Sequence, residues 1–304
     1  MAVTSTPEFR IDSPIDTQPP LVSVVAPSYN GSRYLAEAIV SIFAQDYPHF
    51  EVIIVDDGST DGSFEMLQAL QQQHDFQLYR QANQGVSAAL NYGLQYAKGV
   101  YVATPDLDDV MLAHSLSVRV AYLEQHPEAG MVSANSRYID ENGAVLKDEK
   151  RSTSSRYDFP DILRNARVCG APTALYRMEA LKAAQFYDPD IKVQDFQITL
   201  RITHLGYFVD VIPVLITLYR RHANNLSKRY KRMLEADMAA IAPYRQHPEY
   251  EAGKAQVIHK ALKYAVLEDK RDALRLLRSL PARRWSKATF QRIKRLVLKW
   301  PRRR

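Results

Sequence analysis

Three short apolar runs set the frame of the first third of this chain. They cover residues 21–26, 50–55 and 100–103, and the first two are rich in β-branched side chains. Runs of this length and composition are typical of strands that are buried on both faces of a parallel sheet. The segments between them show helical periodicity, so strands and helices alternate. This alternation predicts an α/β fold built on a doubly wound sheet with right-handed crossovers.

The expected helices of this first part are bounded by ordinary capping signals. Ser32 is a candidate cap for a helix that follows the first strand. Further helices are expected over residues 62–73 and 86–98, and Gly99 would close the second of these in a left-handed conformation. The apolar positions of the first helix recur at intervals of three and four residues, which places them on one face: Leu35, Ala38, Ile39, Ile42 and Phe43.

After Pro127 the pattern becomes less regular. A hairpin turn is expected at residues 140–143, and the polar segment 152–157 is expected to be a mobile loop. The chain from residue 228 onward is helical in pattern, which predicts a helical C-terminal extension. The other expected elements are strands at 131–139, 170–176 and 209–219 and helices at 178–185 and 194–205.

Three carboxylates, Asp106, Asp108 and Asp109, follow the strand at residues 100–103. So many negative charges at a strand end repel one another unless a cation lies among them. Oxygen ligands suit Mg²⁺ or Mn²⁺, and ligands of α/β sheets gather at the carboxyl ends of strands. Considered alone, the cluster is explained equally well by an acidic surface turn in which an Asp caps a helix.

The composition of the 304 residues indicates a globular chain, with 46% hydrophobic and 24% charged residues. A single cysteine, Cys169, excludes an internal disulfide and fits a reducing compartment, so a cytoplasmic location is expected. Residues 1–20 are rich in proline and lack an apolar core, so they are expected to form a disordered leader. No uncharged apolar stretch approaches the roughly 18 to 20 residues that cross a bilayer. Neither a GxGxxG nor a Walker A sequence occurs.

The positive charge is concentrated at the C-terminus. Residues 282–304 contain ten Lys/Arg and no Asp/Glu, whereas the net charge of the whole chain is only +6, so the rest of the chain is mildly acidic. A helix here could lie at the periphery of an anionic membrane, at its inner face, or could pack on the preceding helices and expose a solvated basic face. Both interpretations stay open, and no nucleic acid is expected. The apolar positions of this helix are Phe290, Ile293, Val297 and Trp300.

Several fragments, in order and spacing, resemble the inverting family-2 glycosyltransferases of GT-A fold. The resemblance covers residues 21–227 and implies a Rossmann-like, doubly wound mixed sheet. The fragments are VSVVAPSYN at 22–30, IVDDGSTD at 54–61, NQG at 83–85, DLDD at 106–109, QD at 194–195 with LR at 200–201, and YRRH at 219–222 with the segment that continues to Ser227.

The resemblance implies a role for individual positions. Asp195 matches the catalytic base, Asp108 the metal-binding carboxylate, and His222 a position near the diphosphate or the metal. The nucleotide-binding positions that it implies are Pro27, Tyr29 and Asp57 around the base and Asp106 facing the ribose.

Each of these residues also has an ordinary structural explanation. Asp195 alone could be a helix cap, His222 a surface histidine, and Tyr29 a packing residue. The chain also departs from the family pattern. An Arg that is common in the third helix is replaced by Leu90, which puts one phosphate contact in doubt. The other departures are Gln194 where Glu is frequent, and Thr104-Pro105 in place of a more apolar pair.

The expected activity is transfer of a hexosyl-type sugar from a nucleotide-diphosphate donor to an acceptor hydroxyl with inversion, assisted by Mn²⁺ or Mg²⁺. The acceptor would be a saccharide or a lipid-linked saccharide, as in polysaccharide or glycoconjugate synthesis. Two alternatives stay open, a nucleotidyltransferase and a non-enzymatic binding protein on the same fold. The expected organisation is a leader at 1–20, a transferase domain at 21–227 and a helical extension with a basic tail at 228–304. Residues 21–110 would be the nucleotide-binding half of the domain, and residues 111–227 the acceptor half.

Overall fold

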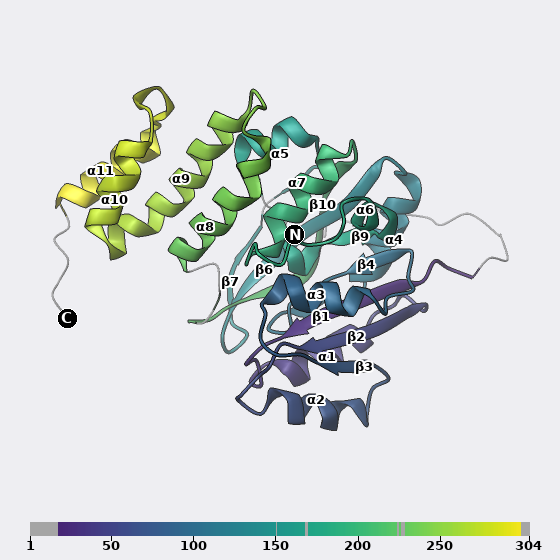
Figure 1. Cartoon of the computed structure of the whole chain (residues 1–304). Helices are drawn as coiled ribbons and strands as arrows, with labels where there is room; N and C mark the ends of the chain where they lie inside the picture. Colours follow the sequence, from purple (N-terminus) through teal and green to yellow (C-terminus); the bar gives the residue numbers. More distant parts are fainter. Residues whose placement is uncertain (1–17, 150, 168–169, 224, 226–228, 299–304) are drawn as a thin grey trace, which may run out of the picture.

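The first part of the structure alternates strands and helices, as the apolar runs predict. The structure is a computed structural model that describes residues 18–149, 151–167, 170–223, 225 and 229–298 (Figure 1). The expected leader falls mainly outside the described residues. The elements of this part are β1 (Val22–Ser28), α1 (Leu35–Phe43), β2 (Phe50–Asp56), α2 (Ser63–Gln71), β3 (Gln77–Arg80), α3 (Val86–Leu94) and β4 (Tyr101–Ala103).

The second part adds strands to the same sheet. The hairpin between β6 and β7 confirms the predicted turn, in which Gly143 has a positive φ and Asp140 accepts two backbone hydrogen bonds. The elements are β5 (Val110–Met111), α4 (Ser115–Gln125), β6 (Ala129–Asp140), β7 (Val145–Asp148), β8 (Ser155–Tyr157), α5 (Phe159–Asn165), β9 (Leu175–Arg177), α6 (Met178–Ala183), α7 (Gln194–His204) and β10 (Phe208–Arg221).

Over the described residues, the sheet has ten strands in the order β3-β2-β1-β4-β9-β6-β10-β5, with β7 beside β6 and β8 beside β10. The strands from β3 to β4 are parallel, and β9 and β5 pair antiparallel with their neighbours. The doubly wound mixed sheet is therefore confirmed. The carboxyl ends of β1, β2 and β4 meet at one edge of the sheet, which is where the predicted site residues begin.

Apolar helices cover both faces of the sheet. On one face, Leu35 and Ile39 of α1, Leu67 of α2 and Leu116 of α4 pack against the strands. On the other face, α3, α6 and α7 contribute a second cluster. The predicted apolar face of α1 is confirmed, since its first four positions are buried and Phe43 packs beside them. This double cover fixes the sheet edge that carries the site.

Four further α-helices form the C-terminal part over its described residues, 229–298. Figure 1 places them beside α5 and α7, at the end of the molecule away from β1–β3. Ile258, Leu262 and Val266 share one buried face, as predicted, and pack on α10 and α11. The helices are α8 (Tyr230–Ile241), α9 (Tyr250–Glu268), α10 (Lys270–Ser279) and α11 (Lys287–Leu298). The domain boundaries at residues 110 and 227 stay predictions, because strands from both halves share one sheet.

Two capping predictions are wrong. Tyr34, rather than Ser32, precedes α1, because the backbone of residues 30–32 instead donates hydrogen bonds to the loop after β2. Helix α3 ends at Leu94, and Gly99 is not left-handed. Gly99 instead allows a close approach of two backbones, since a Cβ there would lie 2.5 Å from the nitrogen of Ser23.

Three expectations for the later segments also need correction. Part of the expected mobile loop at 152–157 forms β8, which pairs antiparallel with β10 at the sheet edge. The strand expected at 170–176 is shorter, since a 3₁₀ turn occupies Ala171–Thr173 and β9 starts at Leu175. In α11, Phe290 faces solvent while Leu296 is buried, so the predicted apolar stripe is not one packed face. Trp300 lies outside the described residues.

Candidate active site

The loops that follow β1 and β2 are joined by hydrogen bonds at the carboxyl edge of the sheet. The backbone nitrogen of Asn30 donates to Ser59 Oγ at 2.9 Å, and the side chain of Asn30 accepts from the nitrogen of Thr60 at 2.8 Å. Ser63 Oγ accepts from the nitrogen of Gly31 at 3.0 Å. These reciprocal bonds hold the two loops as one surface beside the ends of the strands. Pro27 is half-buried there, and Tyr29 is 53% exposed.

Asp57 connects this surface to the start of α3. Its Oδ1 accepts from Gln81 Nε2 and from the nitrogen of Gln84, and its Oδ2 accepts from the nitrogen of Gly85, all at 2.8 Å. The neighbouring Asp56 is buried and pairs with Arg80 at 3.3 Å. Asp57 therefore has a structural role as a cap of the loop before α3, in addition to the nucleotide contact predicted for it.

The acidic cluster predicted from the sequence forms at the end of β4. Asp106, Asp108 and Asp109 each offer a carboxylate oxygen within 4.8 Å of the others. Asp106 and Asp108 are half-buried, and Asp109 is buried. Burial, and then the charge of Asp108, raises the pKa of both Asp106 and Asp109 well above the usual range. The folded protein thus holds negative charge together at a free-energy cost that protons or a cation would relieve.

The three carboxylates have different partners. Asp109 Oδ1 accepts a hydrogen bond from the backbone nitrogen of Arg220 at 2.7 Å, which ties the acidic loop to β10. Asp108 Oδ2 lies 2.8 Å from His222 Nε2. The His222 backbone nitrogen is in turn bonded to Asn225 Oδ1 at 2.6 Å. Asp109 is therefore structural, whereas Asp108 and His222 present a carboxylate and an imidazole side by side.

Arg220 joins the acidic loop to its neighbouring segments through several hydrogen bonds. The sequence analysis does not predict this role. Its side chain is 2% exposed, and Nε donates to the carbonyl oxygen of Asp108 at 2.9 Å. Its other nitrogens donate to Glu37 Oε2 at 2.5 Å and to the carbonyl oxygen of Asp140 at 3.4 Å. The guanidinium also lies over the ring of Tyr34. The sequence contains one signal for this role. Arg220 directly follows the mainly apolar segment 209–219, and a cation that is buried there needs hydrogen-bond partners.

Asp195 lies in the first turn of α7, where the positive end of the helix dipole favours a carboxylate. Its charge contributes to the raised pKa of Asp106, after burial and the charge of Asp108. Burial raises the pKa of Tyr176 and of Tyr187, and the charge of Asp195 adds to both shifts. Asp195, from the second half of the chain, thus acts electrostatically on the acidic cluster and on two buried phenols.

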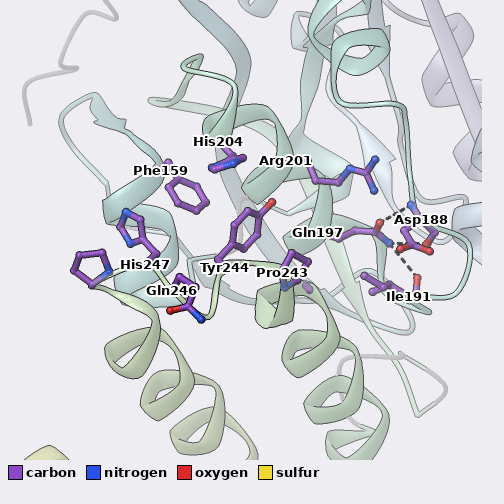
Figure 2. Close-up of a pocket in the computed structure, with 12 residues that line it drawn as sticks. Phe159, Asp188, Ile191, Gln197, Arg201, His204, Pro243, Tyr244, Gln246 and His247 are labelled. Carbon is purple, nitrogen blue, oxygen red and sulfur yellow. Dashed lines mark hydrogen bonds between the residues drawn. The ribbon is translucent and has the colours of Figure 1, made fainter.

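A cavity of about 620 Å³ lies on a different face of α7 (Figure 2). At 100° per residue, Gln197, Arg201 and His204 face the opposite side of the helix from Asp195. Figure 2 shows Phe159, His204, Tyr244 and His247 gathered at one end of this cavity. The rings of Phe159 and Tyr244 pack edge to face, with centroids 4.8 Å apart. None of the site residues predicted from the sequence lines it, so this cavity is separate from the acidic site.

The fold and the acidic loop at its carboxyl edge define a glycosyltransferase of GT-A fold. Residues 23–184 match the family model described as glycosyl transferase family 2. The chain belongs to this family. It is similar to an uncharacterized glycosyltransferase of Methanocaldococcus jannaschii, with 30% identity over 224 residues that cover 71% of this chain and 76% of that protein. It is also similar to the putative teichuronic acid biosynthesis glycosyltransferase TuaG of Bacillus subtilis, with 30% identity over 68% of this chain and 82% of TuaG.

Two solved structures share the fold. The mannosyltransferase PcManGT of Pyrobaculum calidifontis, in complex with GDP-Man and Mn²⁺, superposes with a TM-score of 0.61 at 22% identity and covers 94% of this chain and 89% of its own. Residues 1–349 of S. aureus TarS, in complex with UDP-GlcNAc, superpose with a TM-score of 0.61 at 20% identity over 90% of this chain and 81% of that one. A longer TarS structure is covered to 50% of its length. At these identities the likeness concerns the fold.

Proposed function

We propose that this protein transfers a sugar, of hexosyl type, from a nucleotide-diphosphate donor to an acceptor hydroxyl with inversion at the anomeric carbon. The observation that carries the proposal is the carboxylate cluster after β4, in which Asp108 Oδ2 lies 2.8 Å from His222 Nε2. Asp195 of α7, whose charge contributes to the raised pKa of Asp106, would be the base that acts beside this cluster. The family membership favours this function over the nucleotidyltransferase and over a binding protein without activity.

The donor nucleotide would lie along the carboxyl edge of β1, β2 and β4. Pro27 and Tyr29 would contact the base, with the exposed ring of Tyr29 available for stacking. Asp57 would face the base from its cap position, and Asp106 would accept a hydrogen bond from the ribose. The complexes of structural relatives with GDP-Man and UDP-GlcNAc support a nucleotide-sugar donor for this chain too.

A divalent cation, Mn²⁺ or Mg²⁺, would be held by Asp108 and His222. The residues present fit such an ion, because Asp108 Oδ2 and His222 Nε2 are adjacent and the raised pKa values of Asp106 and Asp109 reflect crowded negative charge. Asp109 is less suited, since one of its oxygens is bound to the backbone of β10. When bound, the metal would supply positive charge next to the diphosphate leaving group.

Asp195 would act as the general base that takes the proton from the attacking hydroxyl. A single base with no covalent intermediate gives one displacement and an inverted product, in the logic of inverting glycoside hydrolases. Arg220 would keep the acidic loop in place while the acceptor and donor are held in line, and such positioning supplies much of the rate acceleration. The buried hydroxyls of Tyr176 and Tyr187 would exclude water from one side of Asp195.

A donor panel tests this proposal. The protein would be incubated with UDP- and GDP-sugars and Mn²⁺, and release of the nucleoside diphosphate would be measured with and without saccharide acceptors. The anomeric configuration of the product would then be read by NMR. Turnover of one donor with an inverted product supports the proposal. Retention of configuration, or no turnover of any donor by a folded protein, contradicts it.

The acceptor is proposed to be a saccharide or a lipid-linked saccharide, in a cytoplasmic enzyme that contacts the inner face of a membrane peripherally. In the described part of the chain, no helix has both the length and the apolar character to pass through a bilayer. Contact would therefore be made by a surface, and the basic C-terminal helix is the proposed element. Competition among soluble saccharides and lipid-linked saccharides as acceptors would identify the preferred class.

A further inference from the structure

The exposed sides of the last two helices carry a dense positive charge. Between residues 270 and 298 the only acidic residue is Asp272, and its side chain is buried and bonded to the hydroxyl of Tyr230 at 3.0 Å. We call the exposed cations of this range the basic face. It consists of Arg271, Arg275 and Arg278 of α10, Arg283 and Arg284 of the following turn, and Lys287, Lys294 and Arg295 of α11.

Large apolar side chains lie among these cations. Phe290 is 60% exposed, Leu274 is 45% exposed and Trp285 is 36% exposed. The rings of Trp285 and Phe290 pack edge to face, with centroids 5.6 Å apart, and the indole nitrogen donates to the carbonyl oxygen of Leu280. The two rings therefore form a fixed apolar projection at the start of α11. Apolar groups surrounded by positive charge are unusual on a surface that faces only water.

The cations of the basic face are not part of the hydrophobic core of the C-terminal helices. Leu276 and Leu277 of α10 pack into the same cluster as Leu296 of α11, against Leu262 of α9. In Figure 1, α10 and α11 lie beyond α9 at the edge of the molecule, so their remaining sides are turned away from the sheet. Arg275 pairs with Asp272 at 2.6 Å. Because the buried and exposed sides are separate, the other cations and the aromatic pair can contact an external partner.

We propose that α10, the turn at Ala282–Arg284 and α11 together form a docking surface for an anionic membrane, with Trp285 and Phe290 inserted among the lipid headgroups. An anionic bilayer satisfies both features at once, because its phosphates attract Lys and Arg while its interface accepts aromatic rings. A nucleic acid duplex would pair its phosphates with the cations but would offer the projecting rings no apolar layer to enter. This inference goes beyond a single basic helix, since five of the eight cations lie on α10 and the turn.

The docking surface is bonded to the first turn of α8. Helix α8 begins shortly after His222, and its first residue, Tyr230, is the one that bonds to Asp272 of α10. Lys231 of α8 also pairs with Asp269, which caps α10, at 3.1 Å. These bonds hold α10 against the first turn of α8. A membrane at the docking surface suits the lipid-linked acceptor, and only this part of the inference rests on the proposed function.

Vesicle sedimentation with the full chain tests the docking surface. Vesicles of phosphatidylcholine, with and without phosphatidylglycerol, would be used at low and high salt. The variant K287E/K294E reverses two cations on the exposed side of α11, and the matched control K98E/K182E reverses two exposed lysines near α3 and α6. We expect binding only to the anionic vesicles, weakened by salt, lowered about tenfold or more in K287E/K294E and unchanged in the control.

A second variant separates the contribution of the two aromatic rings to vesicle binding from the contribution of the cations. W285A/F290A keeps every cation, so it should lose the part of the binding that survives high salt. Absence of binding to anionic vesicles, equal binding to neutral vesicles, or equal losses in K287E/K294E and in the control would each overturn the proposal. Release of nucleoside diphosphate from a soluble donor is measured on the same samples. Failure of that reaction contradicts the proposed function and leaves the docking result standing.

Discussion

His222 Nε2 lies 2.8 Å from Asp108 Oδ2, although 114 positions separate the two residues in the chain. The contact joins the segment after β10 to the loop after β4. It also pairs the two side chains proposed as metal ligands. Asp109, next to Asp108, and Arg220, two positions before His222, have structural roles. Asp109 and Arg220 hold the backbone of the same two segments together, so the contact has a fixed frame.

The first prediction concerns Asp108. Asp108→Asn should reduce transfer at least about a hundredfold, since it removes a proposed metal ligand, while the thermal midpoint stays equal or rises because carboxylate repulsion is relieved. Transfer and thermal unfolding would be measured together. Asp75→Asn, an exposed change in the loop before β3, serves as control. Metal-dependent activity of ordinary size in Asp108→Asn would show that the acidic loop is not the site.

The second prediction concerns Asp195. Asp195→Asn should lower kcat by about 10²–10⁴-fold, because the proposed general base is lost, with donor affinity nearly unchanged. Steady-state kinetics and calorimetric titration of the donor separate the two effects. If donor affinity collapses while kcat is retained, Asp195 belongs to the donor pocket and not to the chemistry.

The third prediction concerns Arg220. Arg220→Lys keeps the charge but cannot reach the Asp108 carbonyl oxygen and Glu37 together, so it should cost about 1–3 kcal/mol of folding free energy and weaken Mn²⁺ binding. Denaturant unfolding and metal titration measure these effects. Arg221→Lys is the neighbouring control, since Arg221 is only half-buried and lies over the rings of Tyr138 and Tyr219. Equal effects in both variants would argue against a positioning role for Arg220.

The fourth prediction concerns pH and metal. Because folding raises the pKa of Asp106 and Asp109, their contribution to stability is complete below the ordinary Asp pKa and is lost as the pH rises through the raised values. A cation can replace the protons at higher pH. Mn²⁺ should therefore raise the thermal midpoint more at about pH 7.5 than at about pH 5. An equal shift at both values, or an undiminished shift in Asp108→Asn, would speak against this linkage.

The sequence predicts the parts of this fold that local patterns determine. The apolar run at 21–26 could only be a buried strand, and the spacing of Leu35, Ile39 and Ile42 required one helical face. The errors come from long-range contacts. The local pattern around Gly99 predicts a helix cap, whereas the absence of a side chain there allows the backbone at Ser23 to approach closely. The polar segment that contains β8 becomes a strand only because β10 supplies a partner.

The candidate site shows the same division. The resemblance implies roles for Asp108, Asp195 and His222, and the structure places Asp108 and His222 side by side. The resemblance did not identify Arg220 as an organiser, because its partners come from α1, the acidic loop and the end of β6. No local sequence pattern indicates that these three segments contact one residue. The cap formed by Asp57 was hidden for the same reason, since its donors lie some 24 to 28 positions away.

The pairing of β5 with β10 sets the order in which the enzyme can mature during synthesis. Val110 and Met111 follow the acidic loop directly, but their partners Leu218 and Thr217 emerge from the ribosome only after nearly all of the sheet has been made. Until then the loop lacks both the strand that anchors it and the guanidinium of Arg220. The carboxylates of a nascent chain are therefore expected to stay in an unassembled loop, and the proposed cation site would be complete only once the last strand is paired. Chains truncated before β10 are expected to expose an unfinished sheet edge, which makes them substrates for chaperones and not partly active enzymes.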